Sequence, residues 1–273
     1  MIIGSAVLIF VTIQASVDLK DDLSDDLKKV LVNFLQISSL AGALPLKWPS
    51  VVQSLFETFN TISSAGSNLL IPDCEFSHLK AADVYFGKQI AFALLVPMLL
   101  VVVVAVWALI FACSRFVVKR KKKKRLKMRD AKDYTVLSCV FLIFLVYPFL
   151  TRMIFSMLKC PQIGDRSYLV ADLQEECVGS KNGQRHSTYF AALTIPQIFI
   201  YVAGLPIGIF LLLRRNKDKV ASNDKSFRIR YGFLFIGFRK ERAWWETVTA
   251  ARKVAVVIIG TFGTVIASPN LQA

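Results

Sequence analysis

The sequence predicts an all-α protein, a polytopic helix bundle in a membrane with about six spanning helices. Three observations support this prediction. Hydrophobic residues make up 55% of the 273 residues, and the mean hydropathy is +0.51. Only 19% of the residues are charged, whereas about 25% are charged in a typical soluble domain. The net charge is nevertheless +15, and long uncharged runs separate the basic stretches, which argues against a soluble enzyme or a nucleic-acid-binding protein.

Four segments are long and apolar enough to be predicted as spans. A spanning helix needs roughly 20 mostly apolar residues, because each residue rises about 1.5 Å and the hydrocarbon core is about 30 Å thick. Backbone amides in lipid must be hydrogen-bonded internally, so each segment is expected to be a helix. The expected spans are residues 88–113, 134–158, 187–213 and 254–270.

Two weaker segments precede these four. Residues 1–17 are uncharged but short, and a cleaved secretory signal is the alternative, although such a signal usually has a positive amino-terminal region. Residues 29–48 are mostly uncharged, and an interfacial or re-entrant helix is the alternative there. Their apolar character is interrupted by polar side chains, namely Asn33, Gln36, Ser38 and Ser39. We favour six spans, with both segments crossing.

The basic residues set the expected orientation. Of the 34 Lys and Arg residues, 23 lie in residues 114–133 and 214–253, which the positive-inside rule places in the cytoplasm. Residues 49–87 and 159–186 are then extracellular loops. The first span would enter from outside at residue 1, and the last would stop close to residue 273. We therefore expect the chain to be the membrane piece of a longer protein, and a truncated gene model is the alternative.

Three of the five cysteines fall on the expected extracellular side, namely Cys74, Cys160 and Cys177. Disulfides form in oxidising compartments, so the favoured pair is Cys160–Cys177, which closes a short extracellular loop. Such a crosslink contributes roughly 3 kcal/mol in a chain-entropy model. Three free thiols, or Cys74 as a partner, are the alternatives. Zinc-ligand spacing and a nucleophile–base set are not recognisable, so no metal, cofactor or enzymatic activity is expected.

A run of basic residues follows the expected span 88–113. It is a candidate contact for anionic lipids of the inner leaflet, at about 1 kcal/mol per basic residue. Phosphoinositide binding and a calmodulin target are the functional alternatives, and we favour an anchor that fixes topology. The residues are Lys119, Arg120, Lys121, Lys122, Lys123, Lys124 and Arg125.

Residues 231–253 combine aromatic and basic side chains, the mixture expected of a helix lying in the headgroup plane. Arg242 and Glu246 have the i,i+4 spacing of a helical ion pair. Such a helix leading into the last span can transmit lateral force, and an ordinary aromatic belt is an equal alternative. The candidate interfacial residues are Trp244, Trp245, Arg242, Glu246, Arg252 and Lys253.

Prolines and glycines interrupt the expected spans. Proline removes a backbone donor and bends a helix, and a GxxxG pattern permits a close helix contact. The residues are Pro97, Pro148, Pro196, Gly204, Pro206 and Gly208. Arg152 lies near the outer end of its span, where we favour a side chain extending to the interface over pairing with the acidic loop. Asp and Glu are absent from the apolar runs, which argues against a proton-relay transporter.

The order of features from Lys28 to Lys253 resembles the TRP-like (transient receptor potential-like) membrane region. That region is found in fungal TRP-like proteins and in protist proteins with extracellular cysteine-rich repeats. The matching pieces are KKVLVNFLQISSLAGALPLKWP (28–49), IPDCEF (71–76), YPFLTRMIFSMLKC (147–160), SYLVADLQEEC (167–177), LPIGIFLLLRRN (205–216), YGFLFIGF (231–238) and RAWWETVTAARK (242–253).

This resemblance implies a channel-type domain that conducts cations and responds to lipids or membrane force. It also implies a large extracellular part upstream. Membrane lipids are the expected partners, together with further copies of the chain or further helices of a longer one. A non-conducting anchor or receptor region of a larger extracellular-repeat protein is the alternative. A transporter is disfavoured because the sequence contains no recognisable inverted repeat.

Overall fold

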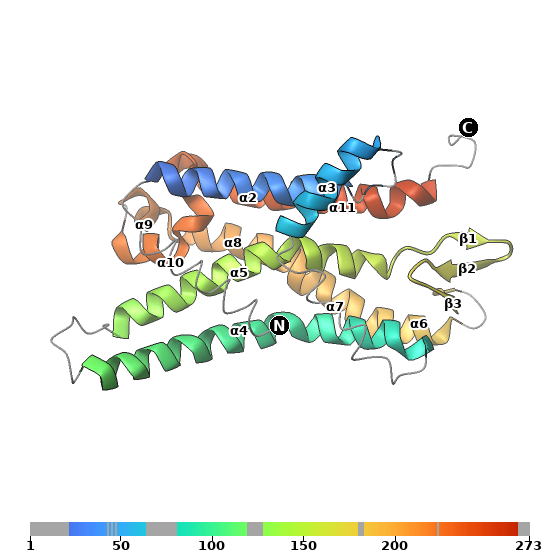
Figure 1. The fold of residues 1–273 in the computed structure, drawn as a ribbon, viewed down its shortest axis with the longest axis horizontal. Helices are drawn as coiled ribbons and strands as arrows, with labels where there is room; N and C mark the ends of the chain where they lie inside the picture. The colour runs from blue at the N-terminus through green and yellow to red at the C-terminus, as the bar shows by residue number, and fades with distance from the viewer. Residues whose placement is uncertain are drawn as a thin grey trace. The chain divides into compact units, whose positions relative to one another are not determined.

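The computed structural model describes residues 22–42, 44, 46, 48–63, 81–118, 128–179, 183–222 and 224–266. This part of the chain is mostly helical, which confirms the helical prediction in its coarse form (Figure 1). The expected span 1–17 and the basic run Lys119–Arg125 lie outside the described residues, as does Cys74.

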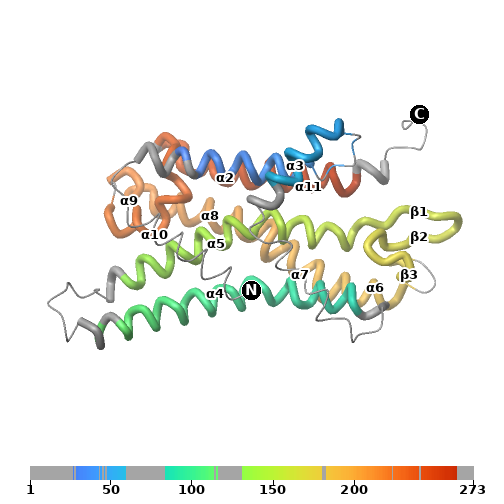
Figure 2. The backbone as a smooth tube through the Cα atoms, viewed as in Figure 1, coloured from blue at the N-terminus to red at the C-terminus, as the bar shows by residue number. Residues whose placement is uncertain are grey.

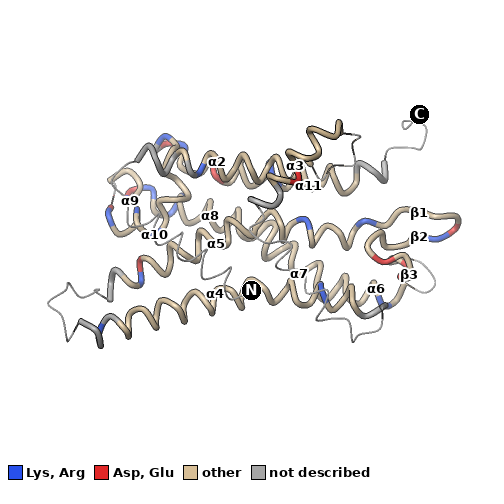
Figure 3. Tube along the Cα trace, in the orientation of Figure 1, with Lys and Arg blue, Asp and Glu red and all other residues tan. Residues whose placement is uncertain are grey.

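In the described part of the chain, three helices are long and apolar enough to cross a membrane. These stretches are Val84–Cys113, Ala131–Ser156 and Gln184–Arg215. They belong to α4 (Ala81–Val118), to α5 (Met128–Ser156) and to a composite helix described next. They match the predicted spans 88–113, 134–158 and 187–213 to within a few residues at each end. Figure 3 shows that α4 is uncharged along most of its length.

The composite helix Gln184–Arg215 is not a regular α-helix throughout. Two π-helical stretches interrupt it, one on each side of Ile195–Gln197, and the backbone tube in Figure 2 can be followed through them. Its consecutive elements are α6 (Gln184–Tyr189), η1 (Phe190–Thr194), α7 (Ile195–Gln197), η2 (Ile198–Ala203) and α8 (Gly204–Arg215).

The predicted span 29–48 is wrong in its boundaries. Helix α2 (Asp22–Gly42) ends earlier, and a second helix, α3 (Ser50–Ser63), follows Pro49 inside the region expected to be a loop. The expected span 254–270 corresponds to α11 (Trp245–Ile266). Neither α2 nor α11 is among the helices that meet the length and composition of a span in the described residues. Six spanning helices are therefore not shown.

The all-α prediction also misses a small antiparallel sheet between the cysteines Cys160 and Cys177. Its strands are β1 (Gln162–Ile163), β2 (Arg166–Leu169) and β3 (Asp172–Glu176), in the order β1-β2-β3. Ile163 pairs with Arg166, so Gly164 and Asp165 form a two-residue hairpin loop. The φ of +64° at Gly164 suits this turn, because tight hairpins require positive φ and glycine adopts it without a steric penalty.

Residues 217–242 form short helices rather than one amphipathic helix. They are α9 (Lys217–Ala221), α10 (Lys225–Phe235) and the 3₁₀ turn η3 (Lys240–Arg242). Asp224 caps α10 by accepting a hydrogen bond of 2.7 Å from the backbone N–H of Phe227. The chain leaves α10 through Gly237, whose φ is +86°. The aromatic and basic stretch 231–253 is therefore not a single helix, because this left-handed residue separates α10 from α11.

The chain forms two compact units, each assembled from three separate segments. The first combines Met1–Leu31, Leu94–Leu145 and Ile209–Glu246, and the second combines Val32–Ala93, Val146–Gly208 and Thr247–Ala273. In the first unit, a buried core contains Leu213, Val220, Phe227, Leu234, Phe235 and Ala243. In the second unit, a buried core contains Leu40, Ile154, Phe155, Val202 and Val257.

Candidate functional site

The composite helix Gln184–Arg215 is widened just before Gly204. A Cβ atom built on Gly204 would lie 2.7 Å from the carbonyl oxygen of Phe199, five residues earlier. That oxygen approaches so closely because η2 is a π-helix, whose turns are wider than those of an α-helix. Any larger residue would push this carbonyl away, so glycine suits the position because of the backbone of its own helix.

Pro206 leaves a backbone carbonyl without its usual partner. In an α-helix the oxygen of Val202 would accept from the N–H of residue 206, but proline has no N–H. The hydroxyl of Tyr147, on α5, instead donates a buried hydrogen bond of 3.1 Å to the Val202 oxygen. A side chain of one helix thus satisfies the backbone of another at the proline.

A similar but longer contact occurs at Pro97 of α4. The carbonyl oxygen of Ala93, four residues before this proline, accepts a hydrogen bond of 3.5 Å from the hydroxyl of Tyr201. Tyr201 lies next to Val202 in η2. Both prolines therefore free a carbonyl that a tyrosine on another helix reaches, and tyrosines of this kind hold helices together where a regular ladder is broken.

The GxxxG pattern makes no close helix contact at Gly208 within the described part of the chain. A Cβ atom on Gly208 would meet no atom within 4 Å, so this glycine does not pack closely against a described helix. Gly204 is needed for the widened turn instead. Pro148 lies within α5 and is buried, and Pro196 lies in α7 between the two π-helical stretches. Helices α4 and α5 continue through Pro97 and Pro148, so these two prolines do not end them.

A buried ion pair in the first unit joins α2 to the start of α11. The ammonium of Lys29 lies 2.9 Å from the carboxylate of Glu246, and both side chains are at most 7% exposed. The same ammonium donates a hydrogen bond of 3.3 Å to the carbonyl oxygen of Ile236, directly after α10. It also lies 4.3 Å from the centre of the Phe238 ring. These neighbours offset the desolvation of the charge.

A second buried polar contact lies in the second unit, on the same two helices. Lys253 donates a hydrogen bond of 2.6 Å to the side-chain oxygen of Gln36. Both residues are almost fully buried. Lys253 is seven residues after Glu246, and Gln36 is seven residues after Lys29, which is the spacing that returns a side chain to nearly the same face of a helix.

These contacts involve two of the predicted interfacial residues, Glu246 and Lys253. Glu246 and Lys253 contact α2 instead of lying in one polar face with Arg242, which precedes α11. Arg252 is exposed. Trp244 packs edge-on against Phe210 at 6.3 Å, whereas Trp245 is 44% exposed. Lys29 was not identified from sequence, although a charge at the edge of an apolar segment was a signal for it.

Another buried carboxylate lies at the start of α5. Asp133 is 3% exposed and accepts hydrogen bonds from the hydroxyl of Ser226 and from the guanidinium of Arg230. Both donors lie on α10. This cluster connects the end of one stretch expected to be cytoplasmic, 114–133, to the interior of the other, 214–253, within the first unit. Sequence spacing could not have identified it, because the partners are more than 90 residues apart.

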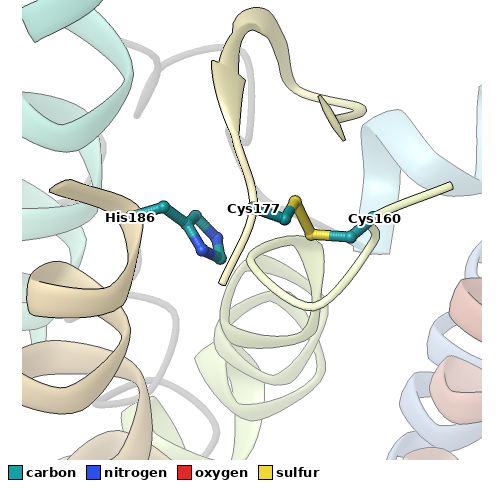
Figure 4. A group of neighbouring side chains, drawn as sticks. All are labelled: Cys160, Cys177 and His186. Atoms are coloured by element: carbon teal, nitrogen blue, oxygen red, sulfur yellow. A yellow bond between two sulfur atoms is a disulfide. The ribbon is translucent and has the colours of Figure 1, made fainter. Parts of the chain in front are cut away.

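The predicted disulfide between Cys160 and Cys177 is present. Figure 4 shows this bond beside the ring of His186, which lies on α6. The Nδ1 atom of His186 accepts a 3.3 Å hydrogen bond from the N–H of Val178, and Nε2 lies 3.1 Å from the carbonyl oxygen of Met157. Because Nδ1 accepts, Nε2 carries the proton and donates to that carbonyl.

The three side chains gather potential metal ligands, but they are engaged otherwise. The ligand atoms of Cys160, Cys177 and His186 all lie within 4.8 Å of one another. Thiolates are the cysteine form that binds metals, and here the two sulfurs bond to each other. Both ring nitrogens of His186 are occupied by backbone groups. The arrangement fits a structural cap that fixes β3 to the start of the composite helix.

Ion pairs at the surface complete this cap. Arg166 on β2 lies 2.7 Å from the Glu176 carboxylate on β3, and Arg185 on α6 lies 3.2 Å from Glu175. The hydrogen bond to Glu176 raises the pKa of the exposed Arg166 guanidinium above its usual value. Gly183 makes close approach possible, since a Cβ atom there would lie 2.1 Å from the carbonyl oxygen of Cys177.

Comparison with known proteins gives one partial relationship and no family. No family model matches the chain, and no solved structure matches it. The chain is similar to the cysteine repeat modular protein A of Toxoplasma gondii, with 31% identity over 128 residues. The match covers 45% of this chain and 4% of the relative, so the chain spans only a small part of the relative's length.

The Tyr147 contact generates a prediction with its own rescue. Tyr147→Phe should lower the free energy of unfolding by roughly 1 kcal/mol, because it leaves the Val202 carbonyl without a donor in an apolar setting. Pro206→Ala restores an N–H at the position that normally bonds this carbonyl, so the double variant should lose less than Tyr147→Phe alone. Chemical unfolding of the purified chain in detergent measures both effects.

Tyr189→Phe is the matched control, because the described residues form no hydrogen bond with the Tyr189 hydroxyl. Equal losses for the two tyrosine variants, or no rescue by Pro206→Ala, would contradict the role assigned to Tyr147.

The buried ion pair generates a second prediction. Lys29→Met or Glu246→Met alone should destabilise the chain by about 3–5 kcal/mol, because each leaves an uncompensated buried charge. The double variant should be destabilised by less than either single one, since the remaining pair is apolar. A double-mutant cycle in detergent measures the coupling, with the exposed Glu241→Gln as the control. Additive losses would show that the two side chains do not interact.

Proposed function

We propose that this chain is a membrane-embedded helical domain of a larger protein, of the TRP-like cation-channel type. In this proposal α2, α4, α5, the composite helix Gln184–Arg215, α11 and residues 1–17 each cross the bilayer. The observation that carries the proposal is the composite helix, which is apolar enough to span and is interrupted by two π-helical stretches and two prolines. Interruptions of this kind frequently occur at functional sites and hinges.

The polar contacts of the composite helix support movement at that place. Tyr147 is held to it by a single hydrogen bond to Val202. Gln197, which is buried at the end of α7 directly before η2, has an amide nitrogen with no hydrogen-bond partner among the described residues. A helix with exchangeable hydrogen bonds can alternate between two arrangements at low energetic cost. We infer that lateral force or bound lipid changes the balance between such arrangements and thereby opens a cation path.

The composition of the two units supports the proposed orientation. The first unit includes the described parts of both stretches expected to be cytoplasmic, up to Glu246. The second unit includes the described parts of both loops expected to be extracellular, with the disulfide cap.

A second candidate is a non-conducting anchor or receptor region. The observation that favours it is the match to 4% of the cysteine repeat modular protein A of Toxoplasma gondii, because a small domain of a very long protein can serve to hold it in the membrane. The rigid disulfide cap at one end of the composite helix suits that role as well. Conduction distinguishes the two candidates.

The proposed orientation predicts a labelling pattern. In intact cells, a membrane-impermeant thiol reagent should label Cys160 and Cys177 after mild reduction, because both lie on the outside. A cysteine introduced by Lys122→Cys should react only after the membrane is permeabilised. Labelling should be compared in a background without Cys113 and Cys139, which the structure shows as free thiols. The reverse pattern would overturn the orientation.

The proposed conduction predicts a stretch-dependent current. Cells that express the full-length protein in a null background should show a cation current under membrane stretch. Tyr147→Phe should shift the pressure for half-maximal activation, because it removes the hydrogen bond between α5 and the composite helix. Tyr189→Phe should leave that pressure unchanged. If surface labelling shows the protein in the membrane and no current appears under stretch or after phosphoinositide depletion, the anchor role is favoured and the channel proposal fails.

A further inference from the structure

A polar cavity of about 330 Å³ lies in the second unit, within the size range of small-molecule sites. The end of α2, the connector after it, α3 and α5 form its walls. The polar and aromatic residues that line it are Ser39, Trp48, Gln53, Phe56, Glu57 and Arg152. None of these residues takes part in the widened turn, the buried ion pair or the disulfide cap.

The shape of this cavity is set by close packing at the end of α2. A Cβ atom on Gly42 would lie 2.5 Å from Cβ of Phe56, so only glycine allows α3 to approach here. Phe56 in turn packs edge-on against the Trp48 ring, with their centres 5.1 Å apart. Trp48 precedes Pro49, which restricts the backbone of Trp48 to extended conformations and lets α3 begin at Ser50.

Two donors at the cavity have no acceptor in the described part of the chain. Arg152 lies within the apolar stretch Ala131–Ser156 of α5, is exposed, and forms no ion pair or hydrogen bond with another described residue. The indole N–H of Trp48 is buried and also has no hydrogen-bond partner there. An ionisable residue within an apolar helix is a candidate functional site, and a guanidinium there favours an anionic partner. A phosphate matches the guanidinium because it can accept two parallel hydrogen bonds.

The remaining wall carries the opposite charge. Glu57 accepts a 3.3 Å hydrogen bond from Gln53 and lines the same cavity as Arg152. The cavity therefore presents one cation and one anion, beside the Trp48 and Phe56 rings, which attract cations through their faces. Leu44 and Leu46 add apolar surface. A ligand that complements all of these features carries a phosphate, a nearby ammonium and an apolar tail.

We propose that this cavity binds the headgroup of a zwitterionic phospholipid. The phosphate contacts Arg152, and the ammonium lies near Glu57 and the aromatic rings. Glu57 disfavours an anionic lipid, whose headgroup would place a second negative charge near the carboxylate. The inference is independent of conduction, because lipid binding is measured on the purified chain whether or not it forms a channel.

The test titrates the full chain, purified in a non-ionic detergent, with short-chain dihexanoyl phosphatidylcholine in a calorimeter. We expect saturable binding that Arg152→Gln weakens at least tenfold and Arg152→Lys weakens less, because lysine keeps the charge but not the paired donors. Arg242→Gln removes an exposed arginine elsewhere and should leave the affinity unchanged. Helical circular dichroism and the thermal midpoint of each variant show whether it is folded. Folded Arg152→Gln that binds normally would overturn the proposal.

Three further ligands identify what is recognised. Dihexanoyl phosphatidylglycerol should bind more weakly than phosphatidylcholine, and Glu57→Gln should reduce or reverse this preference. Free phosphocholine should bind more weakly than the lipid, because it lacks the tail that contacts Leu44 and Leu46. If inorganic phosphate binds as tightly as the lipid, the cavity is a free-anion site and the lipid proposal fails. A preference for phosphatidylglycerol in the unaltered chain would likewise contradict it.

Discussion

Polar groups inside apolar helices must find partners within the protein, and this constraint explains the main contacts of the structure. Pro206 frees the Val202 carbonyl, and the chain supplies the Tyr147 hydroxyl from α5. The widened turn at Gly204 and the proline two residues later thus form one irregular segment. Its backbone is tolerated because another helix satisfies the carbonyl that the segment leaves without a hydrogen bond. At that place the cohesion of the composite helix depends on side chains and not on a continuous ladder of backbone hydrogen bonds.

Charged side chains follow the same rule in the first unit. Lys29 is surrounded by a carboxylate, a helix-terminal carbonyl and an aromatic ring, and Asp133 by a guanidinium and a hydroxyl. A buried pair is weak evidence for stability, because desolvation opposes the attraction. Its value lies in specificity, since only one alignment of α2 with the start of α11 brings Lys29 to Glu246. Arg152 differs from these charges because it is exposed and pairs with no described residue, and the proposed lipid site rests on that difference.

The sequence predicted what depends on local composition and missed what depends on distant partners. The uncharged runs predicted the helices α4, α5 and Gln184–Arg215. The argument that disulfides form in oxidising compartments predicted the pair Cys160–Cys177. The predicted boundary of the span 29–48 was wrong at the end of α2, because Gly42 approaches Phe56 only in the folded chain. The sequence also assigned Glu246 to Arg242 by i,i+4 spacing, whereas the partner is Lys29, more than 200 residues away. The hairpin between the cysteines was not predicted, although Gly164-Asp165 is a recognisable turn signal.

The low hydropathy of α2 and α11 does not by itself argue against their crossing a membrane. The side chains that lower it include Lys29 and Gln36 on α2, and Glu246 and Lys253 on α11, and these contact one another in pairs. A hydropathy average along the sequence treats each of these polar side chains as if it were exposed to lipid. Paired across two helices at matching seven-residue intervals, they instead lie on faces that are turned toward the protein, where polar residues are expected in membrane helices. The surfaces left toward the surroundings include exposed apolar residues such as Val30, Phe34 and Ile259.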